Sequence, residues 1–96
     1  MRTNLKMADP HLCHVCGYEC EGYPWGENSL KPSFEICSCC GTEFGNDDAT
    51  PKGVRQARAR WMENGYPWIA PELKPKDWSP DVQMGRLKDT LWDPWA

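Results

Sequence analysis

Two short stretches decide the fold of this chain: Leu12-Cys13-His14-Val15-Cys16-Gly17-Tyr18 and Ile36-Cys37-Ser38-Cys39-Cys40-Gly41. Each contains the pattern Cys-x-x-Cys-Gly, and we call them the first knuckle (residues 12–18) and the second knuckle (residues 36–41). Two residues between cysteines let one tight turn direct both sulfurs at one tetrahedral ion, and the glycine can take the positive φ that such a turn often needs. The pattern therefore predicts one structural zinc ion, held by Cys13, Cys16, Cys37 and Cys40.

The composition supports a small domain that depends on a metal. A chain of 96 residues has room for one modest core. Leu, Ile, Val and Phe occupy only 13 positions, a share that would by itself suggest disorder. Six cysteines and six tryptophans compensate, because the cysteines can hold a metal and each tryptophan can bury a large apolar surface.

The cysteines also indicate a compartment. Residues 1–10 lack the apolar stretch of a secretory signal, and no segment is apolar for long enough to span a membrane. Without evidence of export, cysteines are interpreted as metal ligands in a reducing environment rather than as disulfides. We expect a cytoplasmic protein with no membrane partner, in which residues 1–10 are a disordered segment and residues 11–96 form a single zinc-ribbon domain with a C-terminal helical extension.

The two halves of the chain differ in charge. Residues 1–50 contain three Lys or Arg and eight Asp or Glu, whereas residues 51–96 contain eight and six. Four thiolates on one zinc ion add about two further negative charges to the first half. An acidic surface repels nucleic-acid backbones and attracts basic proteins.

The segments around the knuckles predict a small α+β fold. Residues 33–37 alternate polar and apolar side chains, which favours a strand entering the second knuckle, and residues 42–44 form the strand that leaves it. Between the knuckles, residues 21–32 are rich in Gly, Pro, Asn and Ser and predict a loop. The expected architecture is a zinc ribbon with short antiparallel strands, followed by an amphipathic helix and a Pro- and Trp-rich wrapping segment.

The amphipathic helix is predicted over residues 51–64. Thr50-Pro51 supplies a capping hydroxyl and a proline at the first helical position, and Asn64-Gly65 is the matching stop signal. One arc of this helix is apolar and consists of Val54, Ala57, Trp61 and Met62. Arg58 lies inside that arc and needs a partner, either the Asp47/Asp48 pair or the face of a tryptophan.

The rest of the chain is punctuated by prolines at positions 67, 71, 75 and 80. They favour an extended segment over residues 66–77, anchored by Trp68 and Trp78. Ser79-Pro80 starts a short second helix over residues 80–87. The apolar end, Leu91 to Ala96, either docks on the domain or is offered to a partner.

Taken together, these residues resemble the small bacterial cysteine-rich zinc-ribbon proteins related to the CPCC-type family. The resemblance covers roughly residues 12–84 and depends on the combination of motifs. It includes Gly17-Tyr18, Glu35-Ile36, Phe44-Gly45, Asp47-Asp48, Arg60-Trp61, Gly65, Trp68 and Trp78-x-Pro80 besides the four cysteines. Members of this group occur beside secreted or contact-delivered bacterial toxins, which implies that some act as immunity proteins. The first knuckle departs from the group's pattern, since His14 stands where a proline is usual.

Few residues suggest catalysis. Four thiolates close the zinc ion to substrates, and the common motifs of hydrolases and phosphate loops are absent from the sequence. Cys20 and Cys39 are interpreted as spare thiols, with a redox pair or a second metal site as the alternative. His11 and His14 are expected on the surface, although either could replace a cysteine ligand. The prediction is a protein that is not an enzyme.

The predicted function is protein binding, through an acidic surface and exposed tryptophans. A basic toxin domain is the expected partner, and covering its active site is the expected mechanism. The alternative is a nucleic-acid-binding or transcription-related zinc ribbon, because Lys52, Arg55, Arg58 and Arg60 cluster on one helix. The predicted partner-binding residues are Glu19, Glu21, Trp25, Glu43, Asp47, Asp48 and Trp95.

Overall fold

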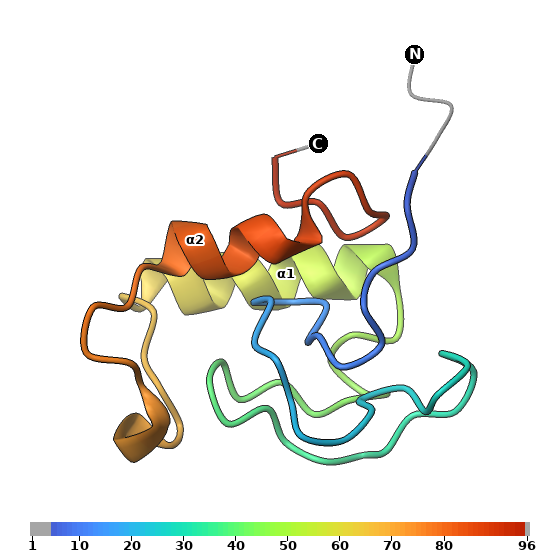
Figure 1. Ribbon diagram of the computed structural model, residues 1–96, viewed down its shortest axis with the longest axis horizontal. Coiled ribbons are helices and arrows are strands. Elements are labelled where there is room, and N and C mark those ends of the chain that lie inside the picture. The colour runs from blue at the N-terminus through green and yellow to red at the C-terminus, as the bar shows by residue number, and fades with distance from the viewer. Residues whose placement is uncertain (1–4, 96) are drawn as a thin grey trace.

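The computed structural model describes residues 5–95. Figure 1 shows two α-helices on one side and long irregular loops on the other. The helices are α1 (Pro51–Glu63) and α2 (Pro80–Met84), and two short 3-10 helices are η1 (Pro71–Leu73) and η2 (Gly85–Leu87). The core joins both knuckles to the buried face of α1 and to Met84 of α2. A small domain with two helices and a cysteine cluster is therefore confirmed.

The predicted ribbon strands are wrong as strands. Within residues 5–95 the structure has no β-strand, and each knuckle is flanked instead by one isolated antiparallel bridge, Leu12 to Glu19 and Ile36 to Glu43. Part of the reason lies in Phe34, whose φ of 61° interrupts the extended run expected over residues 33–37. The two bridges keep the antiparallel pairing of a ribbon at its shortest possible length.

Helix α1 begins and ends close to the predicted residues. The Oγ1 atom of Thr50 accepts a hydrogen bond of 2.9 Å from the backbone N–H of Gly53, and Pro51 is the first helical residue. The chain leaves the helix at Asn64 and turns at Gly65, whose φ is 87°. The buried residues are Val54, Ala57, Arg58 and Trp61, but Met62 is 41% exposed, so its predicted place on the apolar face is wrong.

The second helix and the proline-rich segment also follow the sequence signals. Ser79 caps α2 through a 3.3 Å hydrogen bond from the backbone N–H of Val82, and α2 with η2 covers the predicted residues 80–87. Edge-to-face aromatic contacts link Trp78 to Trp61 and to Trp68, with ring centroids 6.1 Å and 5.3 Å apart. The tryptophans therefore hold the proline-rich segment against the buried face of α1.

The two ends of the described chain lie near each other. The backbone N–H of Lys6 donates a 3.0 Å hydrogen bond to the carbonyl of Asp89. Trp92 packs against the core, whereas Trp95 is 57% exposed. The predicted disorder of residues 1–10 falls partly outside the described residues, since residues 1–4 are not among them, and the domain division stays a prediction.

Candidate metal centre

The two knuckles have the same backbone structure. In the first, the N–H of Cys13 donates to the carbonyl of Tyr18 and the N–H of Gly17 donates to the carbonyl of Cys13, both at 2.9 Å. In the second knuckle the same pair of bonds recurs 24 positions later. It joins Cys37 to Thr42 at 2.8 Å and Gly41 to Cys37 at 3.0 Å. Each turn thereby fixes two thiols on the same side.

Glycine is required at the end of each turn. Gly17 and Gly41 have φ values of 80° and 82°, in the left-handed region that side chains disfavour. A Cβ atom on Gly17 would also collide with the backbone carbonyl of Gln83 at helix α2. The first knuckle can therefore approach α2 closely only because residue 17 has no side chain.

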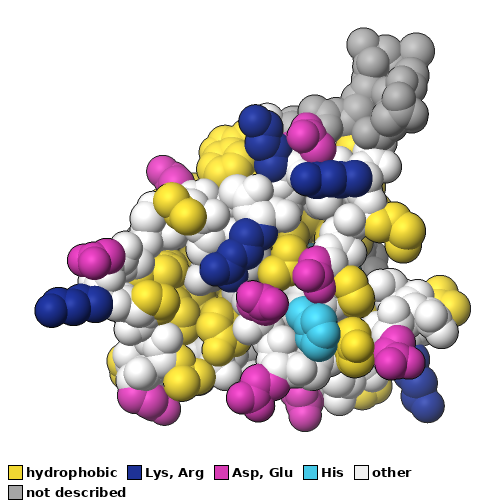
Figure 2. Space-filling view, viewed as in Figure 1, with side chains coloured by type: hydrophobic (Ala, Val, Ile, Leu, Met, Phe, Trp, Pro, Cys, Tyr) yellow, Lys and Arg dark blue, Asp and Glu magenta, His cyan; other side chains and the backbone are white. Residues whose placement is uncertain are grey.

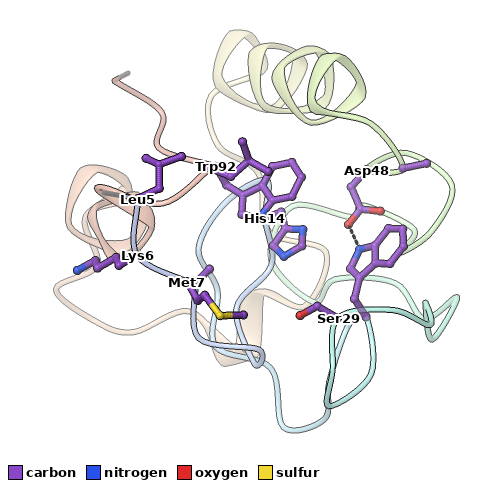
Figure 3. A pocket seen from close by; sticks show the side chains of 11 residues that line it. Leu5, Lys6, Met7, His14, Ser29, Asp48 and Trp92 are labelled. Carbon is purple, nitrogen blue, oxygen red and sulfur yellow. Dashed lines mark hydrogen bonds between the residues drawn. The ribbon is translucent and has the colours of Figure 1, made fainter. Parts of the chain in front are cut away.

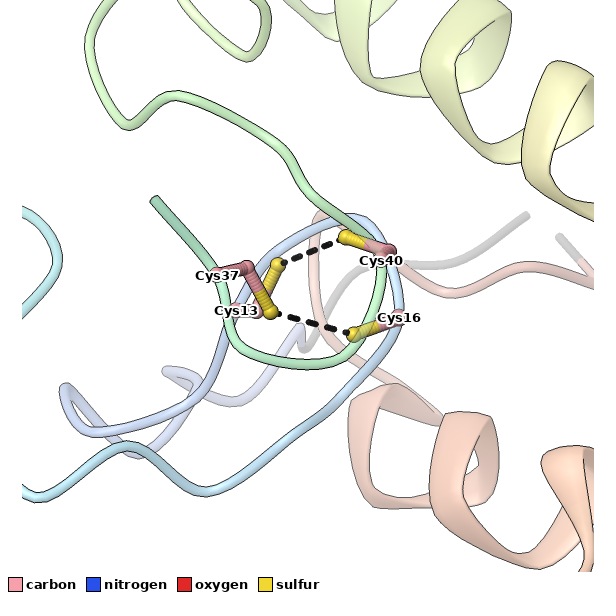
Figure 4. Close-up of side chains that lie close together, drawn as sticks. All are labelled: Cys13, Cys16, Cys37 and Cys40. Atoms are coloured by element: carbon pink, nitrogen blue, oxygen red, sulfur yellow. Dashed lines mark hydrogen bonds between the residues drawn. The ribbon is translucent and has the colours of Figure 1, made fainter. Parts of the chain in front are cut away.

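The knuckles bring together the four predicted sulfurs. The Sγ atoms of Cys13, Cys16, Cys37 and Cys40 all lie within 4.8 Å of one another. Figure 4 shows the four side chains converging from the two turns, with Cys13 to Cys40 and Cys16 to Cys37 each at 3.7 Å. Zinc–sulfur bonds of about 2.3 Å in a tetrahedron place sulfurs about 3.8 Å apart. The four cysteines could therefore hold a metal ion in a tetrahedral site.

Burial and mutual hydrogen bonding set the protonation of these thiols. Burial raises the pKa of Cys13 and of Cys16 well above the ordinary value. By contrast, hydrogen bonds from neighbouring thiols, that of Cys13 first, lower the pKa of Cys37. A divalent cation between the four sulfurs would supply the positive charge that favours the thiolate form of these buried cysteines.

Arg58 supports the first knuckle from helix α1. Its guanidinium donates hydrogen bonds to the carbonyls of Val15 at 2.7 Å and of His14 and Trp92 at 2.8 Å each. The expected partners, the Asp47/Asp48 pair or a tryptophan face, are wrong, because the three acceptors are backbone carbonyls. Burial lowers the pKa of Arg58, and the nearby thiol of Cys13 opposes this shift. The buried positive charge lies where it offsets a negative thiolate cluster.

Gln83 supports the same knuckle from helix α2. Its Nε2 atom donates to the carbonyl of Cys16 at 3.1 Å and to the Sγ atom of Cys39 at 3.4 Å, and its Oε1 atom accepts from the Trp78 indole at 2.9 Å. This role was missed in the sequence analysis. The sequence offers no signal for it, because Gln83 lies 67 positions beyond Cys16.

The two remaining cysteines lie outside the four-sulfur cluster, as expected of spare thiols. Cys39 is fully buried and its sulfur faces Gln83. The Cys20 thiol is partly buried and donates to the carbonyl of Tyr18 at 3.8 Å. The hydrogen bond to Cys37 is the main reason that the pKa of Cys20 is raised, so this thiol stays protonated. All six thiols are free.

The two histidines also lie outside the cluster. His11 stacks on Tyr23 and its Nδ1 atom lies 2.8 Å from the carbonyl of Gly22. His14 is partly buried rather than on the surface, and its ring stacks on Trp92. Burial lowers the pKa of His14, so its imidazole is neutral near pH 7.

The predicted partner-binding residues do not form one exposed surface. Asp48 is only 1% exposed, and its carboxylate accepts hydrogen bonds from the Trp25 indole at 2.9 Å and from the backbone N–H of Gly45 at 2.7 Å. Asp48 is therefore wrong as a surface residue, and Trp25 is held inward by the same bond. Asp47 is partly buried and accepts from the backbone N–H of Glu43 at 2.9 Å.

Three of the predicted partner-binding residues are exposed. Glu19 and Glu21 lie on the surface just after the first knuckle, and Trp95 lies on the surface near the C-terminal end. Glu43 is partly buried.

None of the helices within residues 5–95 is long and apolar enough to cross a membrane.

Comparison with known proteins gives one relative and no established family. An uncharacterized protein of Bacillus subtilis (strain 168), YoaQ, is 29% identical over 82 aligned residues, which cover 70% of each chain. The chain matches no family model and no solved structure. The resemblance to the CPCC-type group stays a prediction, and the site is interpreted from its own geometry.

Proposed function

We propose that the four cysteines hold one structural zinc ion and that this chain is a protein-binding protein rather than an enzyme. The observation that supports this proposal is the closed geometry of the site. Four sulfurs surround one tetrahedral position, and Cys13, Cys16 and Cys37 are at most 1% exposed. A catalytic zinc site keeps one position open for water or substrate, and a closed tetrathiolate site does not.

Zinc is the metal that best suits these ligands. Tetrahedral thiolate sites take zinc or iron, and only iron gives such a site strong visible absorbance. We expect protein purified without added metal to be colourless and to contain one equivalent of zinc by elemental analysis. The free thiols agree with a reducing, cytoplasmic environment. A coloured, iron-containing preparation would contradict the zinc assignment and leave the protein-binding proposal to be tested separately.

The surface offers acidic and apolar groups for a protein partner. In Figure 2, acidic and hydrophobic side chains share the lower part of the face, where Figure 1 places the knuckles and their loops. Two exposed apolar side chains lie at the start of the second knuckle: Phe34 just before it is 61% exposed, and Ile36, its first residue, is 52% exposed. Charge on such a surface accelerates encounter with a basic partner, and apolar side chains supply much of the affinity.

A basic bacterial toxin is the partner that we propose, with this chain as its immunity protein. Toxins that cleave nucleic acids need positive charge at the active site, and an acidic inhibitor can occupy the same charge pattern. The resemblance to toxin-associated zinc-ribbon proteins supports this class of partner. Inhibition would follow from direct competition with the toxin's substrate.

Nucleic-acid binding is the second candidate function. Lys52, Arg55 and Arg60 are exposed on helix α1 and could contact phosphates. Arg58 cannot join them, because its guanidinium is buried and occupied by three carbonyls. The basic cluster is thus smaller than the sequence indicated, which favours the protein-binding proposal.

Charge reversal at exposed positions distinguishes the two candidates. Glu19→Lys with Glu21→Lys changes two exposed carboxylates, whereas reversing Asp47 or Asp48 would disturb bonds that hold the fold. We expect this variant to keep its zinc and to associate more slowly with the product of a toxin-like gene adjacent to this one. The matched control, Lys52→Glu with Arg55→Glu, should leave that association rate unchanged.

Two outcomes would contradict the protein-binding proposal. Association rates and salt dependence that do not change in the Glu19/Glu21 variant would remove its electrostatic basis. Salt-sensitive binding of DNA or RNA by the parent protein, lost in the Lys52/Arg55 variant, would instead support the nucleic-acid candidate.

A further inference from the structure

A pocket lies beside the first knuckle, and none of the four clustered cysteines lines it. Its volume is about 450 Å³, within the range of about 300–1,000 Å³ that is typical of small-molecule sites. Five separate parts of the chain line it: residues 5–8, His14 of the first knuckle, the loop that contains Trp25 and Ser29, residues 48–49 just before helix α1, and the C-terminal residues Leu91 and Trp92. Figure 3 shows the ring of His14 between Trp92, Met7 and Ser29.

The walls of the pocket are aromatic and parallel. The rings of His14 and Trp92 stack with centroids 4.3 Å apart and an interplanar angle of 10°. The Trp25 indole is also close to parallel with His14, at an angle of 15° and a distance of 6.4 Å. At the mouth, Leu5, Met7 and Leu91 are 48%, 88% and 60% exposed. A flat ring can therefore stack on the walls and bury its edge against aliphatic groups.

One polar group in the pocket lacks a partner. The Nδ1 atom of His14 is buried and has no hydrogen-bond partner among residues 5–95. Because this nitrogen is buried in its present position, a ligand could reach it only after a half-turn of the imidazole about its Cβ–Cγ bond. That half-turn exchanges the nitrogen with a ring carbon and keeps the stack on Trp92. A buried polar atom without a partner destabilises the empty site, so a ligand that brings a hydrogen bond to this ring gains affinity.

The charges of the pocket restrict the ligand further. The carboxylate of Asp48 is already bonded to Trp25 and to the backbone of Gly45. The other charged residue in the lining is Lys6, on the exposed N-terminal segment. Neither supplies the buried ion-pairing group that a strongly charged ligand needs. The occupant that fits is uncharged.

We propose that this pocket binds a small, uncharged aromatic compound whose ring carries one hydrogen-bonding group directed at His14. The proposal does not depend on the proposed protein-binding function, because neither the exposed carboxylates of Glu19 and Glu21 nor any of the four clustered cysteines lines the pocket. Suitable probes are p-cresol, which has an aromatic ring and a hydroxyl, and toluene, which has the ring alone.

The test is titration of the zinc-loaded protein with each probe, followed by the indole N–H signals in NMR spectra. We expect the signals of Trp25 and Trp92 to shift and those of Trp61 and Trp78, which lie outside the pocket, to stay in place. p-Cresol should bind about fivefold more tightly than toluene, which is the factor that one net hydrogen bond of about 1 kcal/mol gives.

Two variants separate the hydrogen bond from the cavity. His14→Phe keeps an aromatic ring for the stack and removes the nitrogen, so p-cresol and toluene should then bind equally. Ala49→Phe should fill the pocket and abolish binding of both probes, and His11→Phe is the matched control. Zinc content and circular dichroism establish that each variant is folded. An unchanged preference for p-cresol in His14→Phe, or no shift of Trp25 and Trp92 with either probe, would overturn the proposal.

Discussion

Replacing Arg58 tests how the first knuckle is held against the helices. The side chain is 6% exposed, and its guanidinium donates to the carbonyls of Val15, His14 and Trp92. Arg58→Met keeps much of the aliphatic length but removes the donors, so all three acceptors lose this partner. A buried acceptor that loses its only partner costs about 1–3 kcal/mol. Three such carbonyls therefore cost at least about 3 kcal/mol, a large share of the roughly 5–15 kcal/mol that stabilises a domain.

This loss should be visible in thermal unfolding. A change of 1 kcal/mol shifts the melting temperature by about 4–8 °C in a domain of 60–100 residues. We therefore expect Arg58→Met, loaded with zinc, to melt at least about 12 °C below the parent in circular dichroism. The matched control is Arg55→Met, three positions earlier on the exposed face of α1, which should stay within about 0.5 kcal/mol of the parent.

A third variant separates charge from geometry. Arg58→Lys keeps the positive charge, but one ammonium group cannot reproduce the planar fork that reaches three carbonyls. If the hydrogen-bond fork stabilises the knuckle, Arg58→Lys should lose most of what Arg58→Met loses. A melting temperature of Arg58→Met within a few degrees of the parent would refute the reasoning altogether.

Further predictions concern the metal, the core and the turn glycines. Cys13→Ser should lose its zinc ion and unfold, as the parent does when a chelator removes the metal, since structural zinc contributes about 10–16 kcal/mol of apparent binding free energy. Cys39→Ser should retain one zinc ion. Equal loss of zinc in both variants would contradict the ligand assignment. Trp61→Ala should cost about 3–5 kcal/mol in urea unfolding, because the indole is 4% exposed; a loss below 1 kcal/mol would place the indole outside the core. Gly17→Ala should lower the free energy of unfolding far more than Gly65→Ala. Both glycines have positive φ, but only a side chain at position 17 would collide with the α2 backbone. Equal losses of stability in the two variants would show that backbone strain alone matters.

Local signals in the sequence were sufficient to predict the four-cysteine cluster and the helices. Two Cys-x-x-Cys-Gly turns identify Cys13, Cys16, Cys37 and Cys40 because ligand spacing within a tight turn is a local property. Thr50-Pro51 and Ser79-Pro80 identify the helix starts for the same reason, since a cap bonds only to residues two or three positions away. The strands were predicted wrongly because strand formation depends on pairing and on local φ values such as that of Phe34.

The tertiary structure alone decided which polar residues serve the interior. Asp47 and Asp48 look alike in the sequence, yet only Asp48 turns inward to bond Trp25, a residue 23 positions away. Arg58 was recognised as needing a partner because it interrupts an apolar face, but its acceptors are carbonyls 34 to 44 positions distant. Contacts over such separations depend on how the knuckles, the helices and the C-terminal segment pack together, and no local pattern of residues records that packing.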